Sequence, residues 1–95
     1  MEDRGNLFRL RIIAPEGVFF DEAVHMAEIR TSEGDIGVFR GHIPLTVVLE
    51  PGRARIRQGG SIREALLGKG FAEVLPDRVI ILTVACEWTG ERLNP

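Results

Sequence analysis

Glycine and proline interrupt this sequence at short intervals, and that spacing limits the secondary structure it can form. Eleven glycines and five prolines are spread over 95 residues, and the segments between them are short runs rich in valine, isoleucine, leucine and phenylalanine. Short apolar runs bounded by turn residues are typical of strands, and they leave little room for long helices. We therefore predict an all-β fold, a β-sandwich of about eight to ten short strands.

The clearest strand signal lies near the N-terminus, where apolar and charged residues alternate. Phe8, Leu10 and Ile12 would share one face, and Arg9 and Arg11 the other. Alternation with a period of two is the signature of a strand with one buried face.

The parity of the alternation changes between residues 22 and 31. Val24 and Met26 fall on one face of a continuous strand, whereas Ala27 and Ile29 fall on the other. A β-bulge between Met26 and Ala27 would bring both pairs into the core. A helix is the alternative, since Glu, Ala and Met favour helices; we predict a strand.

A hairpin is predicted after the Pro51-Gly52 turn. Ala54 and Ile56 would face inward, and Gln58-Gly59-Gly60-Ser61 is a turn signal. For Ile56 and Ile62 to share a face, the loop must hold an odd number of residues. We therefore predict a three-residue loop with one glycine in the left-handed region.

The same hairpin could carry a basic stripe made of four arginines, Arg53, Arg55, Arg57 and Arg63. Binding of RNA or single-stranded DNA usually adds exposed aromatic side chains for base stacking, and none lies between these arginines. The net charge of −2 also argues against a general nucleic-acid binder. We favour a solvated or ion-paired sheet face and keep a small nucleic-acid-binding β-barrel as the alternative.

The length of 95 residues fits one domain. We place the β-sandwich in residues 1–86 and expect a short irregular C-terminal tail over residues 87–95. No apolar run reaches the roughly 20 residues that cross a bilayer, and no signal peptide opens the sequence. These features lead us to expect a soluble protein that faces the cytosol.

A catalytic or metal site is hard to assemble from these residues. Cys86 is the only cysteine and follows an apolar strand, so we expect an inert buried thiol; a small enzyme using Cys86 with His25 or His42 as base is the alternative. Gly68-Lys69-Gly70 lacks the spacing of a phosphate-binding loop and precedes a strand. No metal-ligand spacing occurs. We expect no catalytic residue, no metal and no cofactor.

Two polar loops surround one short strand between residues 32 and 44. Glu33 and Asp35 stand beside Gly34, and a Gly41-His42 pair follows the strand. Turn chemistry explains the glycines, but it explains less well why two acids and a Gly-His pair gather at one end of a small sandwich.

At this segment the sequence resembles the epsilon subunit of F-type ATP synthases. Further motifs agree in the same order, and the resemblance covers roughly residues 7–85. The motifs are residues 13–20 (IAPEGVFF), 32–38 (SEGDIGV), 41–45, 51–57, 70–76 (GFAEVLP) and 79–83.

The resemblance implies a ten-stranded β-sandwich and a role without catalysis. The family's epsilon subunit belongs to the rotating central stalk of the alpha, beta, gamma, delta and epsilon assembly. It links the gamma subunit to the c ring, so that ion-driven rotation is coupled to ATP synthesis. The implied location is peripheral, on the cytoplasmic face of the bacterial inner membrane, without membrane insertion and without nucleic acid.

The resemblance also assigns residues to two interfaces. The implied c-ring contacts are Glu33, Gly34 and Asp35, and the implied gamma contacts are Gly41, His42 and Val47. An acidic loop suits the c ring because the facing loops in this family carry an arginine. Two departures stand out: Arg40 replaces a proline that is common in the family, and the sequence ends at Pro95, whereas the family usually continues into a two-helix domain that inhibits ATP hydrolysis.

Overall fold

The computed structural model describes residues 4–93, and its regular structure is almost entirely strand. A short 3-10 helix η1 (Arg4–Asn6) is followed by β1 (Phe8–Ala14), β2 (Gly17–Val24), β3 (Met26–Thr31), β4 (Gly34–Val38), β5 (Leu45–Leu49), β6 (Gly52–Gln58), β7 (Ser61–Leu67), β8 (Gly70–Val74), β9 (Arg78–Thr83) and β10 (Cys86–Leu93). The predicted all-β fold is confirmed, including strand rather than helix over β3.

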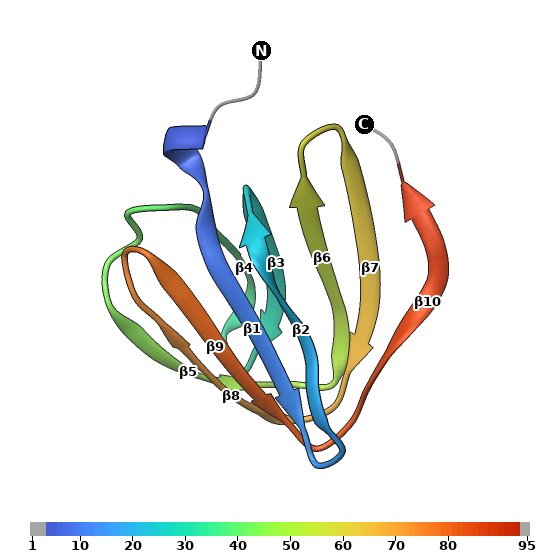
Figure 1. Ribbon diagram of the computed structural model, residues 1–95. Coiled ribbons are helices and arrows are strands. Elements are labelled where there is room, and N and C mark those ends of the chain that lie inside the picture. Colours follow the sequence, from blue (N-terminus) through green and yellow to red (C-terminus); the bar gives the residue numbers. More distant parts are fainter. Residues whose placement is uncertain (1–3, 94–95) are drawn as a thin grey trace.

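The strands pair in one continuous order, β10-β7-β6-β3-β5-β8-β9-β1-β2, and β4 adds to β3. The sheet folds over into two layers (Figure 1), with β3, β4, β6, β7 and β10 in one layer and β1, β2, β5, β8 and β9 in the other. Thr31 of β3 pairs with Leu49 of β5 where the two layers join. Neighbouring strands are antiparallel except β1 and β9.

Aliphatic side chains from both layers fill the space between them. Leu10, Ile12 and Ile81 come from one layer, and Ile29 and Ile56 from the other; all five are fully buried. In β1 the buried and exposed residues alternate as predicted. Burial of apolar surface at about 25 cal/mol per Å² is the main force that holds the two layers together.

The parity change after Val24 is resolved by a break between strands, so the predicted bulge is wrong. The chain bends at His25, where β2 ends and β3 begins. Before the bend, β2 pairs with β1, and after it β3 pairs with β4 and β6. Val24, Ala27 and Ile29 are buried, while Met26 is only half-buried. A bend, like a bulge, lets the apolar residues before and after it face the core. It also moves the chain from one layer to the other.

The hairpin loop between β6 and β7 is shorter than predicted. Its turn contains only Gly59 and Gly60, and Gly59 has a φ of 59°. This even number of residues places Arg63 opposite Ile56 and puts Ile62 on the other face. The expectation that Ile56 and Ile62 share a face is therefore wrong.

The predicted irregular C-terminal tail is wrong for residues 87–93. They belong to β10, which pairs with β7 and has a register shift between Trp88 and Arg92. Residues 94 and 95 lie outside the described residues. Gly90, with a φ of 87°, lies at this irregularity. It interrupts the alternation of residues by which a strand is predicted from sequence.

The two terminal strands of the sheet, β2 and β10, are joined by side chains. The rings of Phe19 and Trp88 stack with their centroids 4.7 Å apart, and Phe20 meets Trp88 edge-on at 5.8 Å. The guanidinium carbon of Arg63 lies 3.7 Å from the centroid of the Trp88 ring. Stacking and a cation–π contact thus close the seam between β2 and β10.

Gly70, at the start of β8, is required by a close approach of two backbones. A Cβ atom built on Gly70 would overlap the carbonyl oxygen of Leu82. Gly70 pairs with Thr83, whose buried hydroxyl lies 3.0 Å from the carbonyl oxygens of Gly68 and Ala85. The backbone next to Gly70 therefore cannot shift to accommodate a side chain without a large cost in free energy.

We expect Gly70→Ala to lower the free energy of unfolding by about 3 kcal/mol, because a side chain there must displace backbone. For a domain of this size that is a fall of roughly 15 °C in the melting temperature. Gly60→Ala is the matched control: its Cβ would meet nothing within 4 Å. Thermal unfolding followed by circular dichroism measures both, and equal melting temperatures for the two variants would contradict the close approach.

Candidate docking surfaces

The acidic loop predicted at residues 33–35 is the tip of the β3–β4 hairpin. Glu33, Gly34 and Asp35 are all exposed, and Gly34 has a φ of 107°. The hydroxyl of Thr31 accepts the Glu33 amide at 3.1 Å and donates to the Gly34 carbonyl at 2.6 Å. Thr31 therefore holds the tip in one shape and turns its acids to solvent.

The two acids at this tip are in different electrostatic states. The Nε of Arg30 donates to a carboxylate oxygen of Asp35 at 3.1 Å, so the charge of Asp35 is partly compensated. Glu33 forms no ion pair with any side chain of residues 5–90. Glu33 is thus the acid most available to an incoming cation.

The Gly41-His42 loop lies at the opposite end of β5 from the acidic tip. The Gly41 amide donates to the Pro76 carbonyl at 2.7 Å, and Gly41 has a φ of 88°. The His42 amide donates to the Phe39 carbonyl at 3.2 Å, and the His42 Nδ1 donates to the Ile43 carbonyl at 2.7 Å. These bonds order the loop against the β8–β9 turn.

Val47 lies on the inner side of β5. It is half-buried and packs against the core, on the same face as Leu49, whereas Val48 points outward. A gamma contact at Val47 stays a prediction, and the residue of β5 that the fold exposes beside it is Val48.

A row of apolar side chains crosses the outer face of the β5, β8, β9, β1 and β2 layer. Register partners connect Val48 to Phe71, Phe71 to Leu82, Leu82 to Ile13, and Ile13 to Val18. Ile13 is half-buried, while Val48, Phe71, Leu82 and Val18 are 46%, 58%, 52% and 53% exposed. We call these five residues the apolar row.

The next row on the same face is mostly polar. It contains Thr46, Glu73, Ile80, Arg11 and Asp21, which are register partners in that order. An apolar centre with a polar border is the usual anatomy of a protein–protein interface. Sequence reasoning missed the apolar row; apolar residues on both faces of β9 are the one signal that pointed to it.

The four hairpin arginines do not form one stripe, so that expectation is wrong. Arg63 lies on the inner face, over Trp88. Arg53 and Arg55 flank the buried carboxylate of Glu64 at 3.3 and 3.8 Å. Ion pairing of these two arginines agrees with the favoured interpretation of the hairpin as an ion-paired sheet face.

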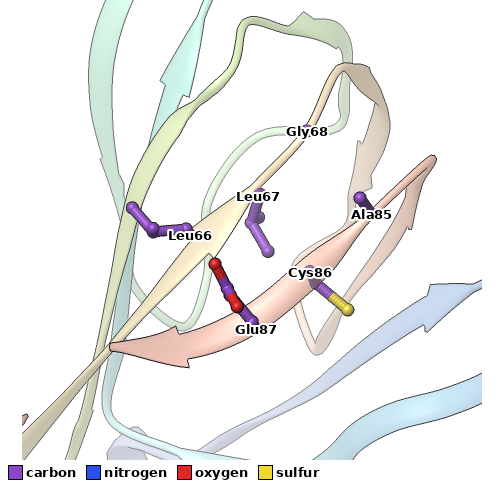
Figure 2. A pocket seen from close by; sticks show the side chains of 6 residues that line it. All are labelled: Leu66, Leu67, Gly68, Ala85, Cys86 and Glu87. Atoms are coloured by element: carbon purple, nitrogen blue, oxygen red, sulfur yellow. The ribbon is translucent and has the colours of Figure 1, made fainter. Parts of the chain in front are cut away.

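The pocket beside Cys86 contains no partner for nucleophilic chemistry among the described residues. Figure 2 shows its lining, which is Leu66, Leu67, Gly68, Ala85, Cys86 and Glu87. Burial raises the pKa of the Cys86 thiol, and the carboxylate of Glu16 raises it further. His25 is bonded to the β6–β7 turn, at the other end of the sandwich from the start of β10 (Figure 1).

No three His, Cys, Asp or Glu side chains among residues 5–90 are grouped closely enough to hold a metal ion. Within the same range, no helix has the length and apolar character needed to cross a membrane.

We expect Cys86 to react slowly with iodoacetamide at neutral pH, because a raised pKa leaves less thiolate than in an ordinary cysteine, whose pKa is about 8.5. The rate should still be rising above that pH. Alkylation followed by mass spectrometry measures it, with the protein unfolded in guanidinium as the control. A rate that levels off below pH 7 would revive the hypothesis of a catalytic thiol.

The fold is a β-sandwich domain that exposes an apolar row and an acidic hairpin tip. Residues 7–89 match the family described as ATP synthase, Delta/Epsilon chain, beta-sandwich domain. The chain belongs to this family.

Relatives and solved structures agree with this assignment. The chain is 38% identical over 84 residues to an ATP synthase epsilon chain of Alkaliphilus oremlandii, covering 88% of this chain and 63% of the relative. A second epsilon chain, from Caldicellulosiruptor saccharolyticus, is 39% identical, with 88% and 61% covered. The chain therefore spans less than two thirds of the length of these relatives.

Two solved structures resemble the fold. One chain comes from the OSCP/F1/c-ring structure of the Euglena gracilis mitochondrial ATP synthase; it has a TM-score of 0.82 and 29% identity, covering 86% of this chain and 53% of that one. The other comes from the central stalk and c ring of the Tetrahymena thermophila enzyme, with a TM-score of 0.71 and 17% identity, covering 84% and 65%. The second supports the fold alone.

Proposed function

We propose that this chain is a non-catalytic element of an ATP synthase central stalk, which binds the gamma subunit and contacts the c ring. The apolar row carries the proposal. Four of its side chains are about half exposed on neighbouring strands, and such a surface is costly to leave in water. A partner protein that covers the row would remove that cost.

The apolar row suits a protein partner better than a small ligand. Its five residues come from five strands, so they form an extended face. A shallow hollow of about 370 Å³ beside the row, lined by Pro15, Phe71 and Leu82 among others, could receive one side chain of the partner. We assign the row, together with the Gly41-His42 loop, to the gamma subunit.

The acidic tip lies next to one end of the apolar row. The Ser32 amide donates to the Val48 carbonyl at 2.9 Å, which ties the hairpin tip to β5. A domain that held gamma on the row would thus present Glu33 and Asp35 beside that contact. We assign this tip to the c ring, because an exposed carboxylate favours a basic partner loop.

In this proposal the chain transmits rotation and performs no chemistry. Rotation would pass from the c ring to gamma through a rigid sandwich, within the alpha, beta, gamma, delta and epsilon assembly. The chain would be peripheral, on the cytoplasmic face of a bacterial inner membrane. The relatives named as ATP synthase epsilon chains are bacterial and support this location.

We expect Leu82→Asp to weaken binding to the gamma subunit by roughly a hundredfold, because docking would bury an unpaired charge at the centre of the row. Leu66→Asp is the matched control, since Leu66 is an exposed leucine of β7 in the other layer. Titration calorimetry with purified gamma measures both affinities. Equal losses for the two variants would remove the row from the interface.

We expect Glu33→Lys to reduce proton pumping per ATP hydrolysed in inverted membrane vesicles that contain the variant complex. The reversed charge would meet a basic c-ring loop, an effect of about 1 kcal/mol that salt weakens. We choose Glu33 and not Asp35 because a lysine in place of Asp35 would stand beside Arg30. Glu22→Lys, an exposed acid of β2, is the control; a normal pumping ratio for Glu33→Lys would count against the c-ring contact.

A further inference from the structure

A basic pocket lies at the end of the sandwich where β2 bends into β3. It has a volume of about 450 Å³, and its lining is Asn6, His25, Phe39, Arg40 and Arg57. These residues come from η1, the β2–β3 bend, the segment after β4, and the end of β6. None of the described lining residues is acidic, so the described lining is positively charged.

Of the two arginines in the lining, Arg57 is the one whose guanidinium makes fewer bonds, because Arg40 is bonded to a carbonyl. Arg57 is half-buried, and its guanidinium forms no hydrogen bond or ion pair with any side chain or backbone of residues 5–90. Its backbone is fixed, because the Arg57 carbonyl accepts the His25 amide at 2.8 Å. By contrast, Arg53 and Arg55 on the same strand are both near Glu64. A partly desolvated guanidinium without a partner gains most from an added anion.

Arg40 and His25 supply further donors that are already oriented. One Nη of Arg40 donates to the Leu7 carbonyl at 3.0 Å, which anchors the guanidinium, and its other N–H groups have no partner among residues 5–90. The Nδ1 of His25 accepts the Gly59 amide at 2.9 Å, so a neutral ring carries its proton on Nε2. The pocket therefore offers N–H donors from three side chains.

The pocket is larger than a bare oxyanion needs. A volume of about 450 Å³ falls in the range of small-molecule sites, which is roughly 300–1,000 Å³. Phe39 is exposed and forms one wall, so a flat apolar group beside the anion could stack on its ring. Arginine forks match the geometry of phosphate oxygens in particular.

We propose that this pocket binds the phosphate group of a small organic phosphate whose ring lies against Phe39. The guanidinium groups of Arg57 and Arg40 and the Nε2–H of His25 hold the phosphate oxygens. The site lies apart from the apolar row and the acidic tip but adjoins the Gly41-His42 loop, because Phe39 and Arg40 directly precede that loop. Its test uses the isolated protein and does not depend on docking to an ATP synthase.

The test is a titration of the isotope-labelled protein with phenyl phosphate and, separately, with inorganic phosphate, followed by amide NMR. We expect saturable shifts at Gly59 and Arg40, and tighter binding of phenyl phosphate than of inorganic phosphate. Arg57→Gln should weaken both by about tenfold, the worth of one charge-assisted hydrogen bond. Phe39→Ala should remove the advantage of phenyl phosphate and leave inorganic phosphate unchanged.

Arg53→Gln is the matched control, because it removes the same charge from the same strand outside the pocket. Its affinity for both probes should equal that of the unaltered protein. Shifts that do not saturate, or an equal loss in Arg53→Gln and Arg57→Gln, would overturn the site. Equal affinities for the two probes would overturn the role of Phe39. Unchanged melting temperatures verify that each variant is folded.

Discussion

The two ends of this sheet meet through side chains, and the integrity of the core depends on that contact. Phe19 on β2 and Arg63 on β7 hold the Trp88 ring of β10 between them. Phe19 and Trp88 also pack against the buried aliphatic residues of the core. The contact adds side-chain packing to β10, whose register with β7 is irregular. A planar guanidinium suits this position because it can stack on an indole without being fully desolvated.

The outer face of one layer shows how a small sandwich can act without a deep active site. The inner face of each strand is used for the core, so the outer face is free to be apolar for another purpose. The apolar row, with charged Glu73 and Arg11 in its polar border, gives that face the anatomy of an interface. The acidic tip is joined to it through Ser32 and Val48. Two different partners could therefore be held close together on one rigid body.

Much of the fold was predictable because burial imposes a period of two on every strand with one inner face. Phe8, Leu10 and Ile12 followed that rule, and β1 formed as predicted. The errors arose where local geometry has several solutions. A parity change can be corrected by a bulge or by a bend, and the chain uses a bend at His25. The loop at Gly59 is one residue shorter than predicted, because Ile62 lies on the outer face and not on the core face.

The sequence alone determined the strand content, the exposed acids at residues 33–35 and the Gly41-His42 turn, because these depend on local alternation and on turn residues. The tertiary structure decided which outward residues become neighbours. Val48, Phe71 and Val18 lie far apart in the sequence, and only the pairing of five strands aligns them. It also separated Arg63 from Arg57, placing one on Trp88 and the other in a basic pocket. Register between distant strands depends on the packing of the whole core, so no local pattern can specify it.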